Sequence, residues 1–444
     1  MSTLRIGVVP FFEGWRGGIY HVGLNVLRAL QGSGDGGCQD EIIVFADGEI
    51  PGWAVKPLRP PSARRRLWRS VRRAVGEGVH REAWRWLRRS CQRPNRVRLP
   101  DPDAIRFNPE MGRWFRRCGI DLMLYMAPTT LCFEVGIPYI TFVPDLRHRL
   151  HLNFAEVFGV GAHDDSNAWE TLEYLFRNAI RSATLVLVDS ETGKEDVLFF
   201  YGSHGASHDR IKVLPYPPPA YLSTACSEED RHRVRHNYKL PSRYVFYPAH
   251  QLYPHKNVDV IIQALERLRR FEHVEVPLVL CGLCPADDVG SRYFQLVMNM
   301  ARYCGVEDQV HYLGYVPDED LSALYDGAAA LVMPTFLGPA NVPYLEAWSV
   351  GCPVLTSDIR GIREQVGDAA LLADPRSTPA MAAAIYRLWC DDALRRKLAE
   401  RGRRHIASYT FDAFRERLLD ILREGNERLH SDRARQADSR NLRR

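Results

Sequence analysis

The sequence has no long hydrophobic run and no P-loop signature. No apolar run approaches the roughly 18 residues that a membrane-spanning helix requires. The N-terminus reaches a glycine-rich turn before the apolar core of a signal peptide could form. The pattern Gly-x-x-x-x-Gly-Lys-Ser/Thr is missing as well, which argues against a P-loop NTPase. We therefore expect a chain that neither spans a membrane nor is secreted through a signal peptide.

Cysteine and metal-ligand patterns are equally sparse. Ten cysteines are scattered over 444 residues without a repeated spacing, which predicts no disulfide framework and a reducing, cytoplasmic compartment. Cys281 and Cys284 form a lone Cys-x-x-Cys without a second pair, so we interpret them as structural and not as a zinc site. Asp101 and Asp103 have an Asp-x-Asp spacing but follow a proline-broken basic segment instead of a strand. No metal site and no cofactor is predicted.

Positive charge is concentrated in one segment. The chain has a net charge of +5, but residues 59–98 alone hold 14 arginines against two glutamates, a local charge of +12. Residues 67–75 and 79–91 place apolar side chains on one helical face and arginine on the other. Two interpretations stay open: helices with a solvated face, or a peripheral contact with an anionic membrane surface. Nucleic-acid binding is not expected, since no groove-reading motif accompanies the arginines.

Short β-like runs alternate with helical segments through the first half of the chain. The strands are expected at residues 4–9, 42–46, 121–125, 138–143 and 184–189. This alternation predicts a parallel, doubly wound sheet, which binds ligands at the carboxyl ends of its strands.

Two groups of residues follow these strands as candidate site residues. Gly17 and Gly18 lie in the turn after the first strand, where glycine allows close backbone approach to an anion or simply a tight turn. Asp145 and His148 follow the strand at 138–143, where they could orient a hydroxyl group or balance developing charge. An ordinary hydrogen-bonded surface histidine is the alternative for His148.

A proline-rich, then polar stretch from residue 212 to 241 separates this half from a second α/β half. Strands are expected there at 244–247, 277–281, 309–313, 329–333 and 353–356, with helices between them and helical patterns at 378–390, 391–403 and 411–423. Two α/β halves of similar kind imply a cleft between them.

The central feature of the second half is the stretch Tyr247 to Asn257. It follows an apolar strand and precedes a helix, so its single lysine, Lys256, is placed where a parallel sheet presents ligands. We interpret Lys256 as a phosphate anchor. A second stretch, from Gly338 to Glu346, enters another helix and would add backbone N–H groups and one carboxylate to the same ligand. Together they suggest a sugar nucleotide.

The chain resembles the family 4 (group 1) glycosyltransferases. The resemblance is carried in the second half by Gly314-Tyr315-Val316-Pro317-Asp318, Pro343-x-Leu345-Glu346-Ala347, Gly351-Cys352-Pro353-Val354, Gly367-Asp368-Ala369-Ala370 and Asp374-Pro375. Pro254-His255-Lys256-Asn257, Gly17-Gly18, Pro144-Asp145-Leu146-x-His148 and Asp189-Ser190 extend it over most of the chain, leaving the basic segment and the tail uncovered.

The resemblance implies a GT-B fold, in which two Rossmann-like doubly wound domains face each other across a cleft. We place the N-terminal, acceptor-side domain at 1–218, with a basic helical insertion at about 58–100. A linker would follow at 219–240, the nucleotide-sugar domain at 241–405, a helix returning to the first domain at 406–428, and a disordered tail at 429–444.

The resemblance also implies a retaining, metal-independent transfer of a hexose from a UDP- or GDP-linked sugar to a saccharide or lipid-linked acceptor. Lys256 would meet the charge of the leaving diphosphate, and the amides of Asn341 and Val342 would add to it. Glu346 would accept hydrogen bonds from the ribose, and the base would lie near Gly314 and Tyr315.

The sequence departs from the family pattern at two positions. The first glutamate of the Glu-x7-Glu motif is replaced by Gly338, and the arginine six residues before the lysine is replaced by His250. Phosphate neutralisation would then depend more on Lys256 or on a protonated His250. Two alternatives stay open beside transfer: a sugar-nucleotide epimerase or hydrolase on the same fold, and a non-catalytic binding subunit.

Overall fold

The computed structural model describes residues 5–10, 18–31, 41–46, 55–56, 105, 107–151, 168–217, 226–284, 288–338 and 340–441. The expected basic insertion at about 58–100 and the Asp101–Asp103 pair lie outside these residues. Within them, no helix is both long and apolar enough to cross a membrane.

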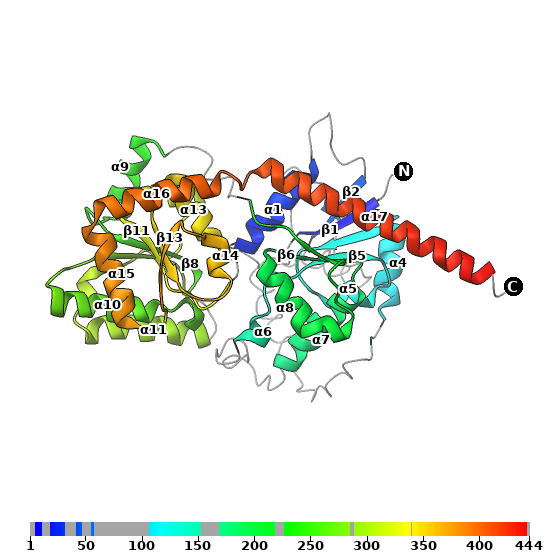
Figure 1. Ribbon diagram of the computed structural model, residues 1–444, viewed down its shortest axis with the longest axis horizontal. Helices are drawn as coiled ribbons and strands as arrows, with labels where there is room; N and C mark the ends of the chain where they lie inside the picture. The colour runs from blue at the N-terminus through cyan, green and yellow to red at the C-terminus, as the bar shows by residue number, and fades with distance from the viewer. Residues whose placement is uncertain are drawn as a thin grey trace, which may run out of the picture.

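Two parallel sheets organise the chain (Figure 1). The first has the order β3-β2-β1-β4-β5-β6-β7 and the second the order β10-β9-β8-β11-β12-β13. The first contains β1 (Arg5–Val9), β2 (Glu41–Phe45), β3 (Val55–Lys56), β4 (Leu122–Tyr125), β5 (Tyr139–Phe142), β6 (Leu185–Val188) and β7 (Ile211–Val213). The second contains β8 (Val245–Gln251), β9 (Leu278–Leu283), β10 (Val310–Tyr312), β11 (Ala330–Met333), β12 (Val354–Ser357) and β13 (Ala370–Ala373).

Helices cover both faces of each sheet. Those of the first domain are α1 (Gly18–Gln31), α4 (Pro109–Arg117), α5 (Thr130–Glu134), α6 (Arg147–Leu150), α7 (Ala168–Ser182) and α8 (Glu191–Tyr201). Those of the second are α9 (Glu228–Asn237), α10 (Val258–Arg267), α11 (Asp288–Tyr303), α12 (Asp318–Asp326), α13 (Val342–Val350), α14 (Ile362–Val366), α15 (Thr378–Cys390) and α16 (Asp392–Ile406). The last helix, α17, spans Phe411–Asn441.

The strand order reverses once in each sheet, between β1 and β4 and between β8 and β11. In open parallel sheets this switch point leaves a crevice at the carboxyl ends of the strands, because the loops on either side leave in opposite directions. The two crevices therefore identify the part of each domain in which a ligand is expected.

Side-chain alternation along the first sheet separates two cores. Ile6, Val8, Leu122 and Leu124 belong to the core shared with α1 and α17, whereas Val9, Met123 and Tyr125 belong to a second core shared with α4, α5, α7 and α8. Successive residues of a strand point to opposite faces, so strands that are apolar throughout are buried on both sides.

Several helices begin at a polar cap that the sequence supplies. The Ser190 hydroxyl accepts a hydrogen bond from the Gly193 amide at the start of α8, at 3.0 Å. Ser377 caps α15 and Asp391 caps α16 in the same way. Each cap satisfies one of the amides that the first helical turn leaves without a partner.

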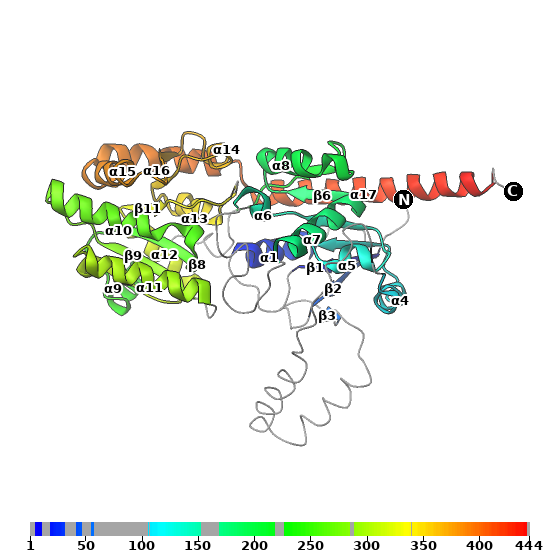
Figure 2. The ribbon, with the colours of Figure 1, turned by 90° about the horizontal axis from the view of Figure 1, so that it is seen from below.

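Helix α17 leaves the second domain and packs along the first, against α1 (Figures 1 and 2). The Arg415 side chain donates to the Ala29 carbonyl at 3.2 Å, and Gly425 lies so close to Ile140 of β5 that an added Cβ would be 3.0 Å from its Cδ1. The expectation of a disordered tail from residue 429 is wrong for residues 429–441, which continue this helix. Leu429 is buried, so apolar packing extends the helix beyond its expected end.

The structure differs from the sequence expectations at other places as well. Helix α9 lies inside the expected linker at 219–240 and packs against α12 of the second domain. The short strands β3, β7 and β13 were not predicted. Each has between two and four residues and lies at or next to a sheet edge, where the periodic signal is weakest.

The packing of α16 on α13 gives a sharp test of the second domain. Gly402 of α16 faces the fully buried Trp348 ring, and an added Cβ would overlap the ring atom Cδ1. Replacing Gly402 by alanine should therefore lower the free energy of unfolding by about 1 to 3 kcal/mol, because a buried indole cannot move aside. Thermal unfolding measures this, with Gly202→Ala as the control, since a Cβ at Gly202 meets open space. Equal melting temperatures for both variants would contradict this packing.

Candidate interdomain active site

The segment around Lys256 is held in place by its neighbour Asn257. Asn257 has a left-handed backbone with φ of 56°, and its side-chain amide donates to the carbonyls of Pro334 and Pro375, both at 2.9 Å. One buried side chain thus joins the loop after β8 to the loops after β11 and β13. A further hydrogen bond, from the Phe336 amide to the His255 carbonyl at 2.9 Å, pairs the first two loops directly.

Lys256 itself ends a short 3₁₀ turn, Pro254–Lys256, at the carboxyl end of β8. Its side chain is half-buried, and its carbonyl accepts a hydrogen bond from the Tyr247 hydroxyl at 2.8 Å. Because β8 and β11 flank the reversal of strand order, Lys256 lies at the switch point of the second sheet. The structure therefore brings Lys256 and the segment after β11 together.

Gly338, which replaces the first motif glutamate, adopts φ of 104°. A Cβ at this position would lie 2.6 Å from Nδ2 of Asn341, so both the backbone and the space favour glycine. A glutamate at this position would need a different loop conformation.

Asn341 and Val342 begin α13, but their amides differ in availability. The Asn341 amide donates to Oε1 of Gln365 at 2.6 Å, and its carbonyl accepts from Nε2 of the same side chain at 2.9 Å. The Asn341 amide is thus already engaged by Gln365, which limits its expected role toward a phosphate. Val342, the first residue of α13, retains the N-terminal position at which an anion is favoured.

Glu346 lies one turn further along α13 and is buried. Its carboxylate accepts a hydrogen bond from the Tyr325 hydroxyl of α12. Gly314 follows β10 with φ of 69°, and its carbonyl accepts from the Gly282 amide at 2.8 Å, while the neighbouring Tyr315 is exposed. The carboxyl ends of β9 and β10 lie on the same edge of the sheet as Lys256. They are on one side of β8, and β11 is on the other.

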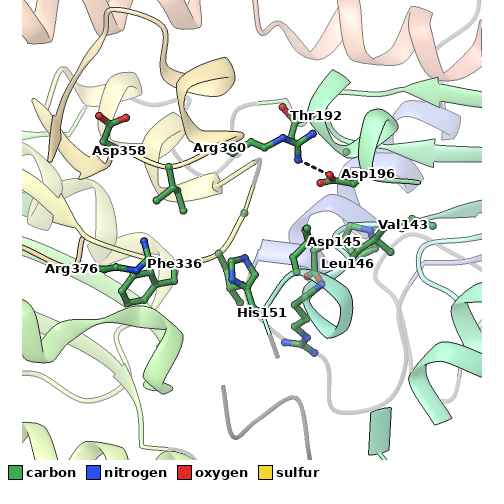
Figure 3. Close-up of a pocket in the computed structure, with 17 residues that line it drawn as sticks. Val143, Asp145, Leu146, His151, Thr192, Asp196, Phe336, Asp358, Arg360 and Arg376 are labelled. Atoms are coloured by element: carbon green, nitrogen blue, oxygen red, sulfur yellow. Dashed lines mark hydrogen bonds and ion pairs between the residues drawn. The ribbon is translucent and has the colours of Figure 1, made fainter. Parts of the chain in front are cut away.

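Asp145 lines a cavity of about 410 Å³ between the two domains (Figure 3). Its Oδ1 accepts a hydrogen bond from the Arg147 amide at 3.0 Å, which fixes the turn into α6. The loop after β5, α6 and the first turns of α8 form one wall, and loops after β11, β12 and β13 form the other. A carboxylate is therefore present where the domains face each other.

His148 does not line this cavity, in contrast to the expectation from its sequence position. It is buried, with Nε2 3.0 Å from the Tyr201 hydroxyl and 3.4 Å from Glu173 Oε2, and its ring packs on Phe176. The single helical turn of α6 rotates His148 away from Asp145 and toward α7 and α8. In this structure it stabilises the first domain and does not face the interdomain cavity.

Glu173 is the carboxylate of this buried group. Burial would raise its pKa, but hydrogen bonds from His148 and Arg149 outweigh burial and lower the pKa to about 2. Arg149 also lies over the Trp169 ring, 5.1 Å from its centre. The group is thus a satisfied ionic network within the first domain.

Charged contacts hold the two domains together beside the cavity. Both carboxylate oxygens of Glu364, in α14, accept from the first amides of α8, from Glu191 at 2.7 Å and Thr192 at 2.8 Å. A carboxylate at a helix N-terminus is stabilised by the unpaired amides and by the helix dipole. Arg360 pairs across the same interface with Asp196 at 2.5 Å and with Glu195 at 2.9 Å. The sequence analysis did not predict Glu364 or Arg360. The only indication in the sequence was that both follow the strand at 353–356.

Asp189 follows β6 at the same interface and is buried. Burial raises its pKa, the Ser190 hydroxyl opposes this with a hydrogen bond, and nearby Asp145 and Glu364 raise it further, to about 7. The Ser190 hydroxyl donates to its Oδ1 at 2.9 Å. Sequence reasoning used Asp189 only as part of a family motif.

Three expected site residues lie outside the described residues or are only partly described. Gly17 lies outside the described residues, and Gly18 is the first residue of α1. His250 belongs to β8, but its side chain is outside the described part of the structure. Among the described residues, no group of three or more potential ligands could hold a metal ion.

Residues 229–405 match the family model for "Glycosyl transferases group 1". This range contains Lys256, Gly338 and Glu346 together with the loops that join them. The second domain thus matches the group 1 glycosyltransferases over nearly its whole length. The resemblance seen in the sequence motifs is thereby confirmed.

Relatives agree with this assignment over part of their length. The chain is 31% identical to the O-antigen chain mannosyltransferase B of Escherichia coli over 251 residues, which cover 54% of this chain and 61% of the relative. It is 28% identical to the D-inositol 3-phosphate glycosyltransferase of Salinispora arenicola over 254 residues, 55% of this chain and 56% of the relative. The matches thus span a little over half the length of these curated relatives.

Solved structures support the GT-B fold over nearly the whole chain. The Anabaena protein HepE, solved in complex with UDP and glucose, matches with a TM-score of 0.65 and 15% identity over 94% of this chain and 99% of that one. Sucrose-phosphate synthase from Thermosynechococcus elongatus matches with a TM-score of 0.65 and 15% identity over 95% and 98%. At these identities the likeness establishes the fold, which confirms the predicted pair of Rossmann-like domains.

Two substitutions of Asn257 distinguish the stabilisation from its side-chain hydrogen bonds from the cost of its left-handed backbone. Replacing Asn257 by glycine keeps the left-handed conformation but leaves two buried carbonyls without partners, which should cost about 2 kcal/mol of unfolding free energy. Asn257→Ala should cost about 1 kcal/mol more, because alanine disfavours positive φ. Urea unfolding measures both. Lys239→Gly, at an exposed position with φ of 49°, is the control and should cause no loss. Wild-type stability of Asn257→Gly would exclude this role.

The raised pKa of Asp189 predicts a pH-dependent stability. An aspartate has a pKa near 3.9 when unfolded and about 7 here, so the folded state binds the proton more tightly between these values. Stability should therefore fall as pH rises from about 4 through 7, by roughly 2 to 4 kcal/mol in total, and Asp189→Asn should remove this fall. Unfolding in urea at pH 5 and pH 8 measures it.

Asp209→Asn is the matched control, because the pKa of Asp209 is lowered to about 2 by hydrogen bonds from Ser207 and Arg428. This carboxylate stays ionised from pH 5 to 8, so the control should retain the wild-type slope. An unchanged slope in Asp189→Asn would show that another group titrates in this range.

Proposed function

We propose that the protein is a retaining glycosyltransferase that moves a hexose from a nucleoside diphosphate sugar to a saccharide or lipid-linked acceptor without a metal ion. The observation that carries the proposal is the junction made by Asn257, which holds Lys256 beside the segment leading into α13 at the switch point of the second sheet. The Escherichia coli relative is named a mannosyltransferase, which makes a mannose nucleotide the first donor to test.

The chemical task is to stabilise a diphosphate leaving group while the glycosidic bond breaks through an oxocarbenium-like state. Lys256 supplies a full positive charge for that diphosphate. The N-terminus of α13 at Val342 supplies partial positive charge, in the geometry that favours anions at helix ends. Because Gln365 engages the Asn341 amide and Pro343 has no N–H, the helix contribution rests on the Val342 amide and the helix dipole. Gly17 and Gly18 would contribute amides from the opposite domain.

The remaining roles follow from position. Glu346 would bind the ribose, for which it exchanges its hydrogen bond with Tyr325 for bonds from the sugar hydroxyls. Gly314 and Tyr315 lie beyond β8 from the phosphate site and would contact the base. Asp145, on the cavity wall of the first domain, would orient the acceptor hydroxyl or balance the positive charge of the transition state. His148 would act only indirectly, by holding α6 in place.

Gly338 supports one alternative. Glycine supplies no carboxylate at the first motif position, so a GT-B shell that binds nucleotides without turnover is the second candidate. An epimerase or hydrolase on the same fold is distinguished from a transferase by whether donor turnover requires an acceptor.

We place the protein in the cytoplasm, with the arginine-rich segment at 59–98 as the proposed contact to a membrane surface.

Lys256→Ala is the decisive variant. Loss of its charge should lower kcat/KM for transfer by at least about 10²- to 10³-fold while the fold is kept, because the leaving diphosphate loses its main cation. A screen of UDP- and GDP-linked hexoses against a panel of saccharide acceptors measures the activity, and circular dichroism checks folding. Lys239→Ala, at an exposed lysine of the same domain, is the control and should retain wild-type rates.

Two outcomes would remove this proposal. Wild-type activity in Lys256→Ala would exclude the assigned role of the lysine. Binding of a nucleotide sugar by calorimetry without turnover across the acceptor panel would favour the non-catalytic subunit.

A further inference from the structure

The interdomain cavity is displaced from the switch point of the first sheet and reaches that of the second only through the loop after β11. Its walls are the loop after β5, α6 and the start of α8 in the first domain, and the loops after β11, β12 and β13 in the second. Lys256 and Val342 do not line it, although Leu337 and Gly338 form part of its wall and connect it to the donor segment. A volume of about 410 Å³ is in the range of small-molecule sites. The cavity therefore adjoins the proposed donor site and leaves room for a second ligand.

Three of the ionic groups in the cavity wall are already neutralised. Arg360 pairs with Asp196 at 2.5 Å, and Asp358 pairs with Arg363 at 2.6 Å. These pairs leave the side chains of two other lining arginines, Arg147 and Arg376, without a carboxylate within ion-pair distance among the described residues. Asp145 is the carboxylate that remains.

Arg376 is positioned by one contact of its guanidinium and one hydrogen bond of its backbone. Its guanidinium lies over the Phe336 ring, 5.1 Å from the ring centre, and its amide donates to Asp374 Oδ1 at 2.9 Å. The preceding Pro375 carbonyl is held by Asn257. A guanidinium carries its N–H donors in a planar fork that matches phosphate or carboxylate oxygens.

The two cations come from opposite domains. Arg147 belongs to α6 of the first domain, and Arg376 belongs to the loop after β13 of the second. In Figure 3, Arg376 and Phe336 lie on one side of the cavity and Asp145 on the other, with His151 between them. Burial lowers the pKa of His151, the charge of Asp145 opposes this, and the charge of Arg376 adds to the lowering.

Resting on the glycosyl transfer proposed above, we propose that this cavity binds an acceptor that carries a phosphate group, which Arg376 and Arg147 hold from opposite walls. A carboxylate can be satisfied by a single guanidinium, whereas the oxygens of a phosphate point in several directions and can bind two. Asp145 repels the phosphate and so directs it toward Arg376. The uncharged hydroxyl end of the acceptor is then left beside Asp145, where transfer requires it.

Inorganic phosphate is the first probe. It is titrated by calorimetry into the full chain, with and without saturating UDP or GDP to fill the donor site. Wild-type protein should bind phosphate in both conditions, and Arg376→Ala and Arg147→Ala should each weaken the Kd by about tenfold or more. Arg302→Ala is the matched control, because this arginine is paired with Glu307 at 3.1 Å and neither residue lines the cavity. It should leave the Kd within about twofold.

Failure of this inference is distinguishable from failure of the proposed function. Absence of nucleotide binding would count against glycosyl transfer, whereas phosphate binding can still be read without nucleotide. Phosphate binding that is lost in Lys256→Ala but kept in Arg376→Ala would place the anion at the donor site and overturn the inference. Absence of saturable phosphate binding in folded wild-type protein would overturn it as well.

Three further probes identify the source of the phosphate. Glucose 1-phosphate represents a soluble sugar phosphate, farnesyl diphosphate in detergent micelles represents a lipid-linked acceptor, and glucose is the uncharged control. One phosphorylated probe should bind more tightly than inorganic phosphate and should lose that advantage in Arg376→Ala. If both bind no more tightly than inorganic phosphate, or if glucose binds equally well, the cavity is not a site for a phosphorylated acceptor.

Discussion

The side-chain amide of Asn257 holds together the loops on which the second domain presents its ligand-binding groups. Its two N–H groups reach the carbonyls of Pro334 and Pro375, which follow two different strands. Such a buried amide is satisfied only if all three loops keep their relative positions, because an unpaired buried carbonyl is costly. Lys256 precedes Asn257, and Arg376 follows Pro375. Both the proposed donor anchor and the proposed acceptor anchor therefore depend on the same side chain.

A second constraint acts between the domains. Glu364 accepts from the first amides of α8, and Arg360 pairs with two carboxylates of the same helix. These contacts lie beside the cavity, so the position of one wall relative to the other depends on them. Each is polar and partly exposed, which makes the net stabilisation modest and the interface able to open. A ligand that contacts both walls would shift the equilibrium toward the closed arrangement, in proportion to its preference for that state.

Much of the architecture was accessible from the sequence, because each buried parallel strand is a continuous apolar run and each begins or ends near a turn residue. The locations of Lys256, Gly338 and Asp145 after strands followed from the same pattern. The orientation of His148 did not, since one turn of α6 decides whether that side chain faces the cavity or α7, and tertiary packing sets the turn. The engagement of the Asn341 amide by Gln365 was inaccessible for a similar reason: the partner is 24 residues away and belongs to another element. Helix α17 is longer than expected. The polar sequence after residue 428 has no apolar periodicity that predicts a helix, and the helix is stabilised instead by its contacts with the first domain.

The path of α17 has a consequence for how the molecule is made. Helix α1 is among the first segments to be synthesised, but the helix that packs against it begins only at Phe411. At about 5 to 20 residues per second, a ribosome needs roughly 20 to 80 s to complete the intervening chain. During that time the apolar face of the first domain that α17 later covers, including Ile140, is exposed to solvent and to other chains. The first domain is thus the first to be synthesised but the last to be completed.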